Sequence, residues 1–139
     1  MIRIRAADAT DARTIHKLQR KTLPKDVPLA FEGPRWWIAY DNDKPVAYAA
    51  LSNAEEPNAG YLSRSGVLKT HRGLGLQKRL IRVRLRAAKR LGMKVVVSDA
   101  VKGNGPSCNS LIACGFRVFA PAKPWGLDRS VYWRRRLDN

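Results

Sequence analysis

The chain has 139 residues and a mass of 15.6 kDa, which is the size of one domain and too small for two ordinary cores. Hydrophobic residues make up 45% of it and charged residues 27%, a composition that excludes the disordered and fibrous classes. The 27 lysine and arginine residues against 11 acidic residues leave a net charge of +16, so an anionic partner must be considered. No apolar run approaches the roughly 18 to 20 residues of a membrane span, and residues 1–7 alternate apolar and basic residues without the apolar core of a signal peptide. We therefore expect a soluble, cytoplasmic protein with a single domain over residues 1–139.

The first half of the chain predicts three strands and one helix. Alternating apolar and basic residues indicate a strand over Ile2–Ala6, and a capped helix follows that ends near Thr22. Two runs of aromatic and small apolar residues come next, over Arg35–Tyr40 and Val46–Ser52. The turn residues Asp41-Asn42-Asp43-Lys44 join them, which is typical of a β-hairpin.

The second half of the chain predicts alternating strands and helices. A strand over Tyr61–Leu68 precedes a long helical pattern over Gly73–Leu91, which Gly92 ends. The elements after it are a strand over Lys94–Ala100, a helix over Pro106–Cys114, and strands over Phe116–Phe119 and Val131–Leu137. Cys108 and Cys114 have no second cysteine pair or histidine beside them, so we expect neither a metal site nor a disulfide.

The segment from Arg72 to Lys78 joins the expected strand Tyr61–Leu68 to the long helix. Its two glycines, Gly73 and Gly75, let the backbone approach a ligand closely. The first N–H groups of the helix point outwards at the positive end of its dipole, and no acidic residue is near. These features predict a cradle for a pyrophosphate; the alternative is that the glycines only make a tight turn. The segment is not a Walker loop, because it has no Gly-Lys-Ser/Thr.

The long helix carries an apolar stripe and a basic stripe. The apolar stripe is expected to face the core and contains Leu76, Leu80, Val83, Ala87 and Leu91. The basic stripe contains Lys78, Arg82, Arg86 and Lys89, with no acidic residue to pair them. Like charges at this spacing cost roughly 0.2 to 0.5 kcal/mol per pair. The basic helix, residues 78–90, therefore raises the hypothesis of nucleic acid or an acidic protein as a partner, and the alternative is that its charges serve solubility alone.

Two stretches resemble motifs of the GNAT superfamily of acyl-CoA-dependent N-acyltransferases. The residues from Gly66 to Ile81, GVLKTHRGLGLQKRLI, look like its motif A. The residues from Asn104 to Phe116, NGPSCNSLIACGF, resemble its motif B, which begins with Asn and ends in Gly-Phe. The resemblance implies one α/β domain with a mixed, mostly antiparallel sheet of six to seven strands flanked by helices. The sheet is expected to be splayed between the strands at 61–68 and 94–100.

The resemblance also implies acetyl-CoA as the co-substrate. Its pyrophosphate would bind the amides from Arg72 to Lys78, and its pantetheine arm would lie along the strand that ends at Leu68. In the family a bulge in that strand leaves unpaired backbone groups facing the ligand. The amide of Val67 matches the position that polarises the thioester carbonyl, a backbone role worth a few kcal/mol of transition-state stabilisation. The cofactor-binding residues implied are Val67, Leu68, Arg72, Gly73, Leu74, Gly75, Leu76, Gln77, Lys78, Asn104, Ser107 and Asn109.

Three positions depart from the family pattern. Gln77 stands where the phosphate loop usually has Gly or Ala, although its amide can donate to phosphate. Leu111 stands where many members have a tyrosine that protonates the departing thiolate. Ser107 is the candidate proton donor in its place. The alternatives are Asn109, a water molecule, or a thiolate that leaves without being protonated. The strand Tyr61–Leu68 has no glutamate to act as general base, and the substitutes considered are Glu32, Glu55, Glu56 and His71.

We therefore expect an N-acetyltransferase that moves an acetyl group directly from acetyl-CoA to an amine. The alternative is a basic module that keeps the fold, has lost efficient catalysis and binds nucleic acid or an acidic protein. Small amines, protein N-termini, lysines and aminoacyl-tRNA all stay open as acceptors, and both a monomer and a homodimer stay open as assemblies. The loop Pro121–Asp128, with Trp125, is expected either to wall the acceptor site or only to anchor its own turn.

Overall fold

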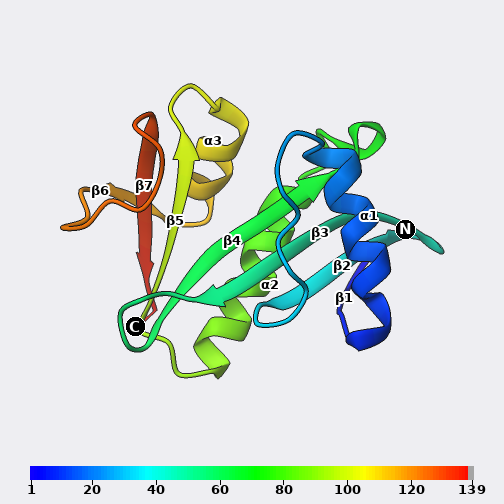
Figure 1. The fold of residues 1–139 in the computed structure, drawn as a ribbon, viewed down its shortest axis with the longest axis horizontal. Helices are drawn as coiled ribbons and strands as arrows, with labels where there is room; N and C mark the ends of the chain where they lie inside the picture. Colours follow the sequence, from blue (N-terminus) through cyan, green and yellow to red (C-terminus); the bar gives the residue numbers. More distant parts are fainter. Residues whose placement is uncertain (138–139) are drawn as a thin grey trace.

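The computed structural model describes residues 1–137 and has one sheet of seven strands with three α-helices (Figure 1). The strands are β1 (Ile2–Ala6), β2 (Arg35–Asp41), β3 (Lys44–Asn53), β4 (Ala59–Val67), β5 (Val95–Val101), β6 (Arg117–Phe119) and β7 (Ser130–Arg136). The α-helices are α1 (Ala12–Thr22), α2 (Leu76–Arg90) and α3 (Gly105–Ala113), and two short 3-10 helices are η1 (Ala9–Asp11) and η2 (Lys69–His71). This order of strands and α-helices confirms the predicted one.

The sheet is mixed and comes apart in its middle. Its strand order is β1-β2-β3-β4-β5-β7-β6, and every neighbouring pair is antiparallel except β4 and β5. The parallel pairing of β4 and β5 covers only Ala59–Tyr61 against Val95–Val97. Beyond these residues the two strands diverge, as Figure 1 shows. The predicted splayed sheet is therefore confirmed.

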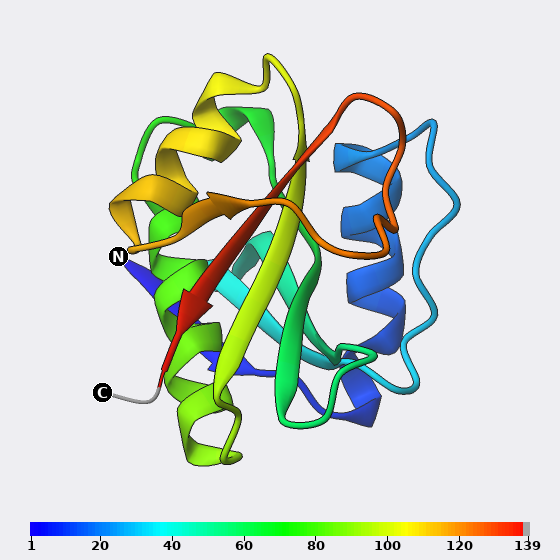
Figure 2. The same cartoon turned by 90° about the vertical axis from the view of Figure 1, so that its left-hand side faces the viewer.

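Helices cover both faces of the sheet. Figure 2 shows α1 on one face and α2 and α3 on the other. On the α1 face, Ile15 and Leu18 of α1 pack against Trp36, Ile38 and Tyr48 of the sheet. On the other face, α2 packs against β3 and β4, and its C-terminal half joins the large core cluster that contains Phe116 and Trp133. No helix within residues 1–137 is both long and apolar enough to cross a membrane.

The start of α2 differs from the prediction. The sequence pattern extends the helix back to Gly73, whereas the helix begins at Leu76. Gly73 and Gly75 have φ angles of +80° and +79°, which lie in the left-handed region and cannot continue a right-handed helix. The apolar stripe also needs a correction: Leu91, predicted to be buried, is 44% exposed, and Arg84 is buried in the stripe instead.

The entry to α1 depends on a half-buried ion pair. Two nitrogen atoms of Arg5 donate to the two carboxylate oxygens of Asp11, at 2.8 and 2.9 Å. Asp11 also accepts from the backbone N–H of Asp8 and is 6% exposed. The hydrogen bonds from Arg5 hold the pKa of Asp11 below its usual value. The pair therefore stabilises the folded state above the pKa of the unfolded chain, and this contribution is lost as the pH falls through the folded pKa.

We expect Asp11→Asn to lower the free energy of unfolding at pH 7 by about 1 to 2 kcal/mol, the modest value reflecting the exposure of Arg5. At pH 3, below the ordinary value of 3.8, the difference from the wild type should be smaller, because the contribution of the pair is lost as the pH falls towards the lowered pKa of Asp11. Urea unfolding at the two pH values measures both effects. Asp26→Asn, at an exposed residue, is the matched control and should leave stability nearly unchanged. An Asp11→Asn deficit as large at pH 3 as at pH 7 would contradict this account.

Candidate functional site

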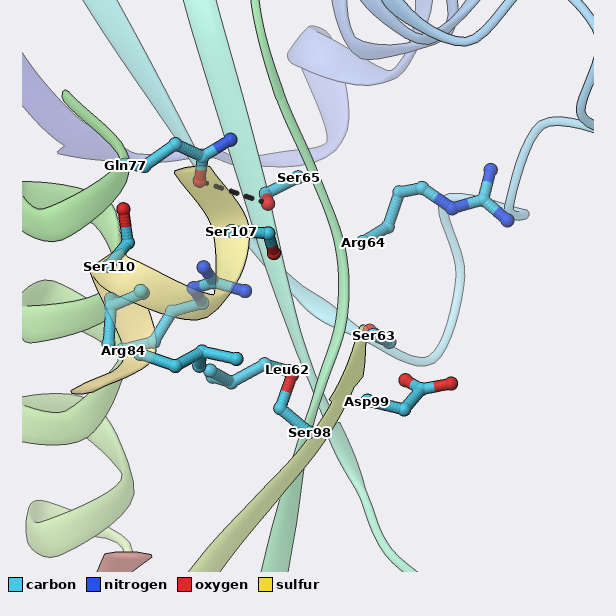
Figure 3. A pocket seen from close by; sticks show the side chains of 12 residues that line it. Leu62, Ser63, Arg64, Ser65, Gln77, Arg84, Ser98, Asp99, Ser107 and Ser110 are labelled. Carbon is cyan, nitrogen blue, oxygen red and sulfur yellow. Dashed lines mark hydrogen bonds between the residues drawn. The ribbon is translucent and has the colours of Figure 1, made fainter. Parts of the chain in front are cut away.

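A cavity of about 180 Å³ lies where β4 and β5 part (Figure 3). Both strands and the two helices α2 and α3 contribute to its wall. Its lining residues are Leu62, Ser63, Arg64 and Ser65 of β4, Ser98 and Asp99 of β5, Gln77, Ile81 and Arg84 of α2, and Ser107, Ser110 and Leu111 of α3. The wall is therefore rich in hydroxyl groups and carries two arginines and one carboxylate.

The backbone of β4 turns unpaired amides towards this opening. The register between β3 and β4 shifts from Ala50↔Arg64 to Leu51↔Leu62, which leaves Ser63 as an extra residue, a β-bulge. Beyond the bulge, the N–H of Leu68 donates to the carbonyl of Val46 at 2.9 Å. Hydrogen bonding alternates along an antiparallel pair, so the N–H groups of Val67 and Ser65 point away from β3 and towards β5. Since β5 has diverged there, these two amides have no strand partner.

The loop between β4 and α2 is an open cradle of amides. A Cβ atom added to Gly73 or Gly75 would meet nothing within 4 Å, so the space in front of both glycines is free. Gly75 is the N-cap of α2, no side chain caps this end, and the first helical N–H groups have no partner inside the helix. Arg72 ties the loop to β4, because its Nε donates to the carbonyl of Val67 at 3.1 Å. This end of α2 therefore suits an anionic group with several oxygen atoms.

Arg84 is a buried cation in the wall of the cavity. Its side chain is 2% exposed, and its Nε and Nη1 donate to the carbonyls of Leu80 and Ala50, both at 3.1 Å. The register shift of the sheet begins at Ala50, so Arg84 satisfies a carbonyl beside the bulge. None of the ion pairs within residues 1–137 involves Arg84. Burial lowers the pKa of Arg84 to about 9, which leaves the guanidinium charged at neutral pH.

Asp99 is the carboxylate of this cavity, and it comes from β5. Its Oδ1 accepts a hydrogen bond of 2.7 Å from the hydroxyl of Tyr61. Burial, and then this hydrogen bond, raise the pKa of Tyr61, so the hydroxyl keeps its proton and its role as donor. Figure 3 shows Asp99 and Arg64 on one side of the two strands, with Arg84, Gln77 and the serines of α3 on the other.

The loop between β6 and β7 covers the Asp99 side of the opening. The ring of Trp125 packs against Tyr132 at a centroid distance of 4.6 Å and against Tyr61 at 6.1 Å, in edge-on contacts. The backbone N–H of Gly126 donates to the hydroxyl of Tyr132 at 2.8 Å. Trp125 thus fixes its loop onto the sheet, and 42% of its side chain stays exposed at the edge of the site.

The predicted site residues divide into two groups. Ser107 and Gln77 line the cavity, where the Ser65 hydroxyl donates to Oε1 of Gln77 at 3.3 Å. Leu111 also lines it and is 3% exposed. The other predicted residues lie outside the cavity wall. The side chain of Asn104 accepts a hydrogen bond from the N–H of Ser107 and so caps α3, and the side chains of Asn109 and Leu74 are exposed. The remaining residues lie at the end of β4, in the loop after it or at the start of α2: Val67, Leu68, Arg72, Gly73, Gly75, Leu76 and Lys78.

None of the four substitute bases considered from the sequence lies at the opening. His71 binds Asp41 at 2.8 Å, close to the N-terminus of the chain. Glu55 and Glu56 line a separate cavity beside the β3–β4 connection, and Glu32 is exposed on the loop before β2. The structure brings Asp99 to the opening instead. The sequence held a signal for it, because Asp99 is the single acidic residue in a strand of otherwise apolar and small residues.

The comparisons with known proteins agree with this geometry. A model of the acetyltransferase (GNAT) family matches residues 4–116. A Bacillus subtilis acetyltransferase in complex with CoA is 18% identical, with a TM-score of 0.81 over 99% of each chain. A Salmonella typhimurium protein solved with its cofactor acetyl-CoA is 20% identical, with a TM-score of 0.79 over 99% of this chain and 94% of that one.

The ribosomal-protein-S18-alanine N-acetyltransferase from Escherichia coli is 14% identical, with a TM-score of 0.78 over 98% of this chain and 94% of that one. No curated protein matches the sequence. At these identities the solved structures establish the likeness of the fold, and the family model covers most of the chain. The protein therefore belongs to the acetyltransferase (GNAT) family.

Proposed function

We propose that the protein is an N-acetyltransferase that moves an acetyl group from acetyl-CoA directly to the amine of an acceptor. The observation that carries the proposal is the parting of β4 and β5 next to an open cradle of amides at the start of α2. The membership of the GNAT family and the CoA and acetyl-CoA complexes of proteins with the same fold support it.

The residues present fit the binding of acetyl-CoA. The open space at Gly73 and Gly75 and the uncapped amides of α2 suit the pyrophosphate, and Lys78 adds a positive charge beside them. The unpaired amides of Val67 and Ser65 suit the amide carbonyls of a pantetheine arm that takes the position of a missing strand. The side chain of Gln77 is turned towards Ser65, so the groups that face the pyrophosphate in the cradle are backbone amides.

Bound acetyl-CoA would supply a thioester that is reactive towards a neutral amine. An amine that arrives as an ammonium ion must first lose a proton, and Asp99 is the carboxylate at the opening that can accept it. The hydroxyl of Tyr61 orients Asp99 for this role. We assign the polarisation of the thioester carbonyl to the amide of Val67, or to that of Ser65, which points the same way and lines the cavity.

The acceptor would approach from the side of Asp99 and Trp125. Aromatic side chains and one carboxylate there suit a positively charged amine before it loses its proton. The experiment that tests the function has two stages. Calorimetry should detect binding of acetyl-CoA, and release of free thiol should then be followed with a panel of small amines, peptides with free N-termini and lysine peptides. Binding of acetyl-CoA without thiol release from any amine, together with salt-sensitive binding of nucleic acid, would instead support a basic binding module.

A further inference from the structure

Arg84 is a charge that lacks a counter-ion. A guanidinium group has five N–H donors, and within residues 1–137 Arg84 uses Nε and Nη1, both towards backbone carbonyls. Burying an unpaired charge costs several kcal/mol, and apolar side chains occupy the neighbouring positions Leu80 and Ala88 of the same helix stripe. Arg84 in the wall of the cavity therefore lowers the stability of the folded protein, because its charge is buried without a counter-ion.

The charged and titratable groups that face Arg84 do not neutralise it. Asp99 lines the same cavity, but its Oδ1 accepts from Tyr61 and it lies on the other side of the parted strands (Figure 3). Arg64, also in the wall, is itself a cation. Just after α3, the thiol of Cys114 donates to the carbonyl of Lys78, and burial raises the pKa of this thiol and keeps it neutral. A reactant bound in the cavity can supply the anion that these groups do not.

Near Arg84 the cavity offers only serine hydroxyls, Ser107 among them, as side-chain donors of a proton to a leaving group. Its hydroxyl groups all belong to serines, and histidine, tyrosine, cysteine and lysine are absent from its wall. Leu111 contributes only hydrocarbon. A serine hydroxyl is a much weaker acid than a thiol, so we expect a thiolate that departs here to leave as an anion.

We propose that Arg84 binds the thiolate sulfur of coenzyme A as it leaves, and so replaces protonation by charge pairing. This inference rests on the function proposed above. In the step, the acceptor nitrogen forms a bond to the acyl carbon while the carbon–sulfur bond breaks, and the electron pair of that bond stays on sulfur beside the guanidinium. The nitrogen of an ammonium acceptor loses two protons in all: Asp99 accepts the first before the attack and passes it to water, then accepts the second as the amide forms, and the thiolate takes a proton from solvent after release.

Binding of coenzyme A and of desulfo-coenzyme A, in which hydrogen replaces the thiol, tests the proposal at equilibrium. The ratio of the two affinities isolates the sulfur, because every other contact is shared. If Arg84 stabilises the thiolate, the pKa of the bound thiol falls below that of the free thiol. The preference of the wild type for coenzyme A should then rise about ten- to hundredfold between about pH 6.5 and 8.5.

Three variants sharpen the test. Arg84→Gln should make the affinity ratio independent of pH over this range, and Arg84→Lys, which keeps the charge, should retain part of the rise. Arg86→Gln makes the same change at an exposed position of α2 and should behave as the wild type. Thermal unfolding checks that each variant is folded, because Arg84→Gln also loses the bond to Ala50.

Two outcomes would overturn the inference. The first is a pH-independent ratio in the wild type, which can be read even if Arg84→Gln fails to fold. The second is a preference for malonyl-CoA over acetyl-CoA that Arg84→Gln abolishes, because the guanidinium would then serve a carboxylate of the acyl group. Failure of the wild type to bind either coenzyme would overturn the proposed function as well, which separates the two claims.

Discussion

Replacing Gly75 with glutamate is expected to abolish the binding of acetyl-CoA. Gly75 has a φ of +79°, and its Cα faces open space at the N-cap of α2, where the pyrophosphate is proposed to bind. A carboxylate there would meet the phosphates, and a side chain at this φ costs roughly 1 to 2 kcal/mol in addition. We expect the affinity measured by calorimetry to fall at least about a hundredfold.

Gly92 provides a matched control for this variant. It lies just beyond the other end of α2, has the same φ of +79°, and a Cβ there would also meet nothing within 4 Å. Gly92→Glu therefore imposes the same backbone strain without a charge at the cradle, and it should bind acetyl-CoA as the wild type does. Equal losses of affinity in the two variants would mean that strain and not phosphate repulsion is responsible, and unchanged affinity of Gly75→Glu would remove the proposed cradle.

Replacing Asp99 with asparagine is expected to slow the transfer and spare the binding of the cofactor. A well-placed general base contributes about 10² to 10⁴ to a rate, so kcat/KM for an ammonium-bearing acceptor should fall by that order. Asparagine keeps the size of the side chain and can still accept the hydrogen bond from Tyr61, so the fold should survive. Steady-state release of thiol gives the rate, and calorimetry gives the affinity for acetyl-CoA.

Asp43→Asn is the control for the chemical change itself, because Asp43 is exposed in the turn between β2 and β3. It should retain full activity. An Asp99→Asn enzyme with wild-type kcat/KM would show that the amine loses its proton to solvent, and the role of Asp99 would then be withdrawn. A loss of acetyl-CoA affinity in Asp99→Asn would instead indicate a part in cofactor binding.

The order of the elements could be predicted because each one has a local cause. The alternation in Ile2–Ala6, the turn at Asp41–Lys44 and the glycine after α3 act over a few residues, and the structure follows them closely. The predicted start of α2 is wrong because the spacing of apolar residues carries no information on backbone angles. Gly73 and Gly75 both have left-handed φ angles, so the helix begins after them. The extra residue in β4 depends on pairing with a distant strand, and its expectation came from the family resemblance.

The side chains of the candidate site were harder to predict than its backbone. The loop from Arg72 to Gln77 carries its own pattern of glycines and charges. Arg84 belongs to neither of the two stripes predicted for the helix, although its spacing of four from Leu80 and from Ala88 puts it on the buried stripe. Asp99 becomes relevant only because β4 and β5 part beside it, and this is a property of the sheet that no single strand encodes.

The short parallel pairing of β4 and β5 also affects how the molecule responds to a ligand. Three paired residues on each strand join one part of the sheet, strands β1, β2, β3 and β4, to the other part, strands β5, β7 and β6. A molecule that binds to both parts supplies contacts between them where the hydrogen bonds between β4 and β5 are missing. It should therefore slow amide hydrogen exchange at Ser65 and Val67 and make thermal melting sharper. We therefore expect the two parts of the sheet to move relative to each other about Tyr61 and Val97 more in the free protein than in the complex with the co-substrate.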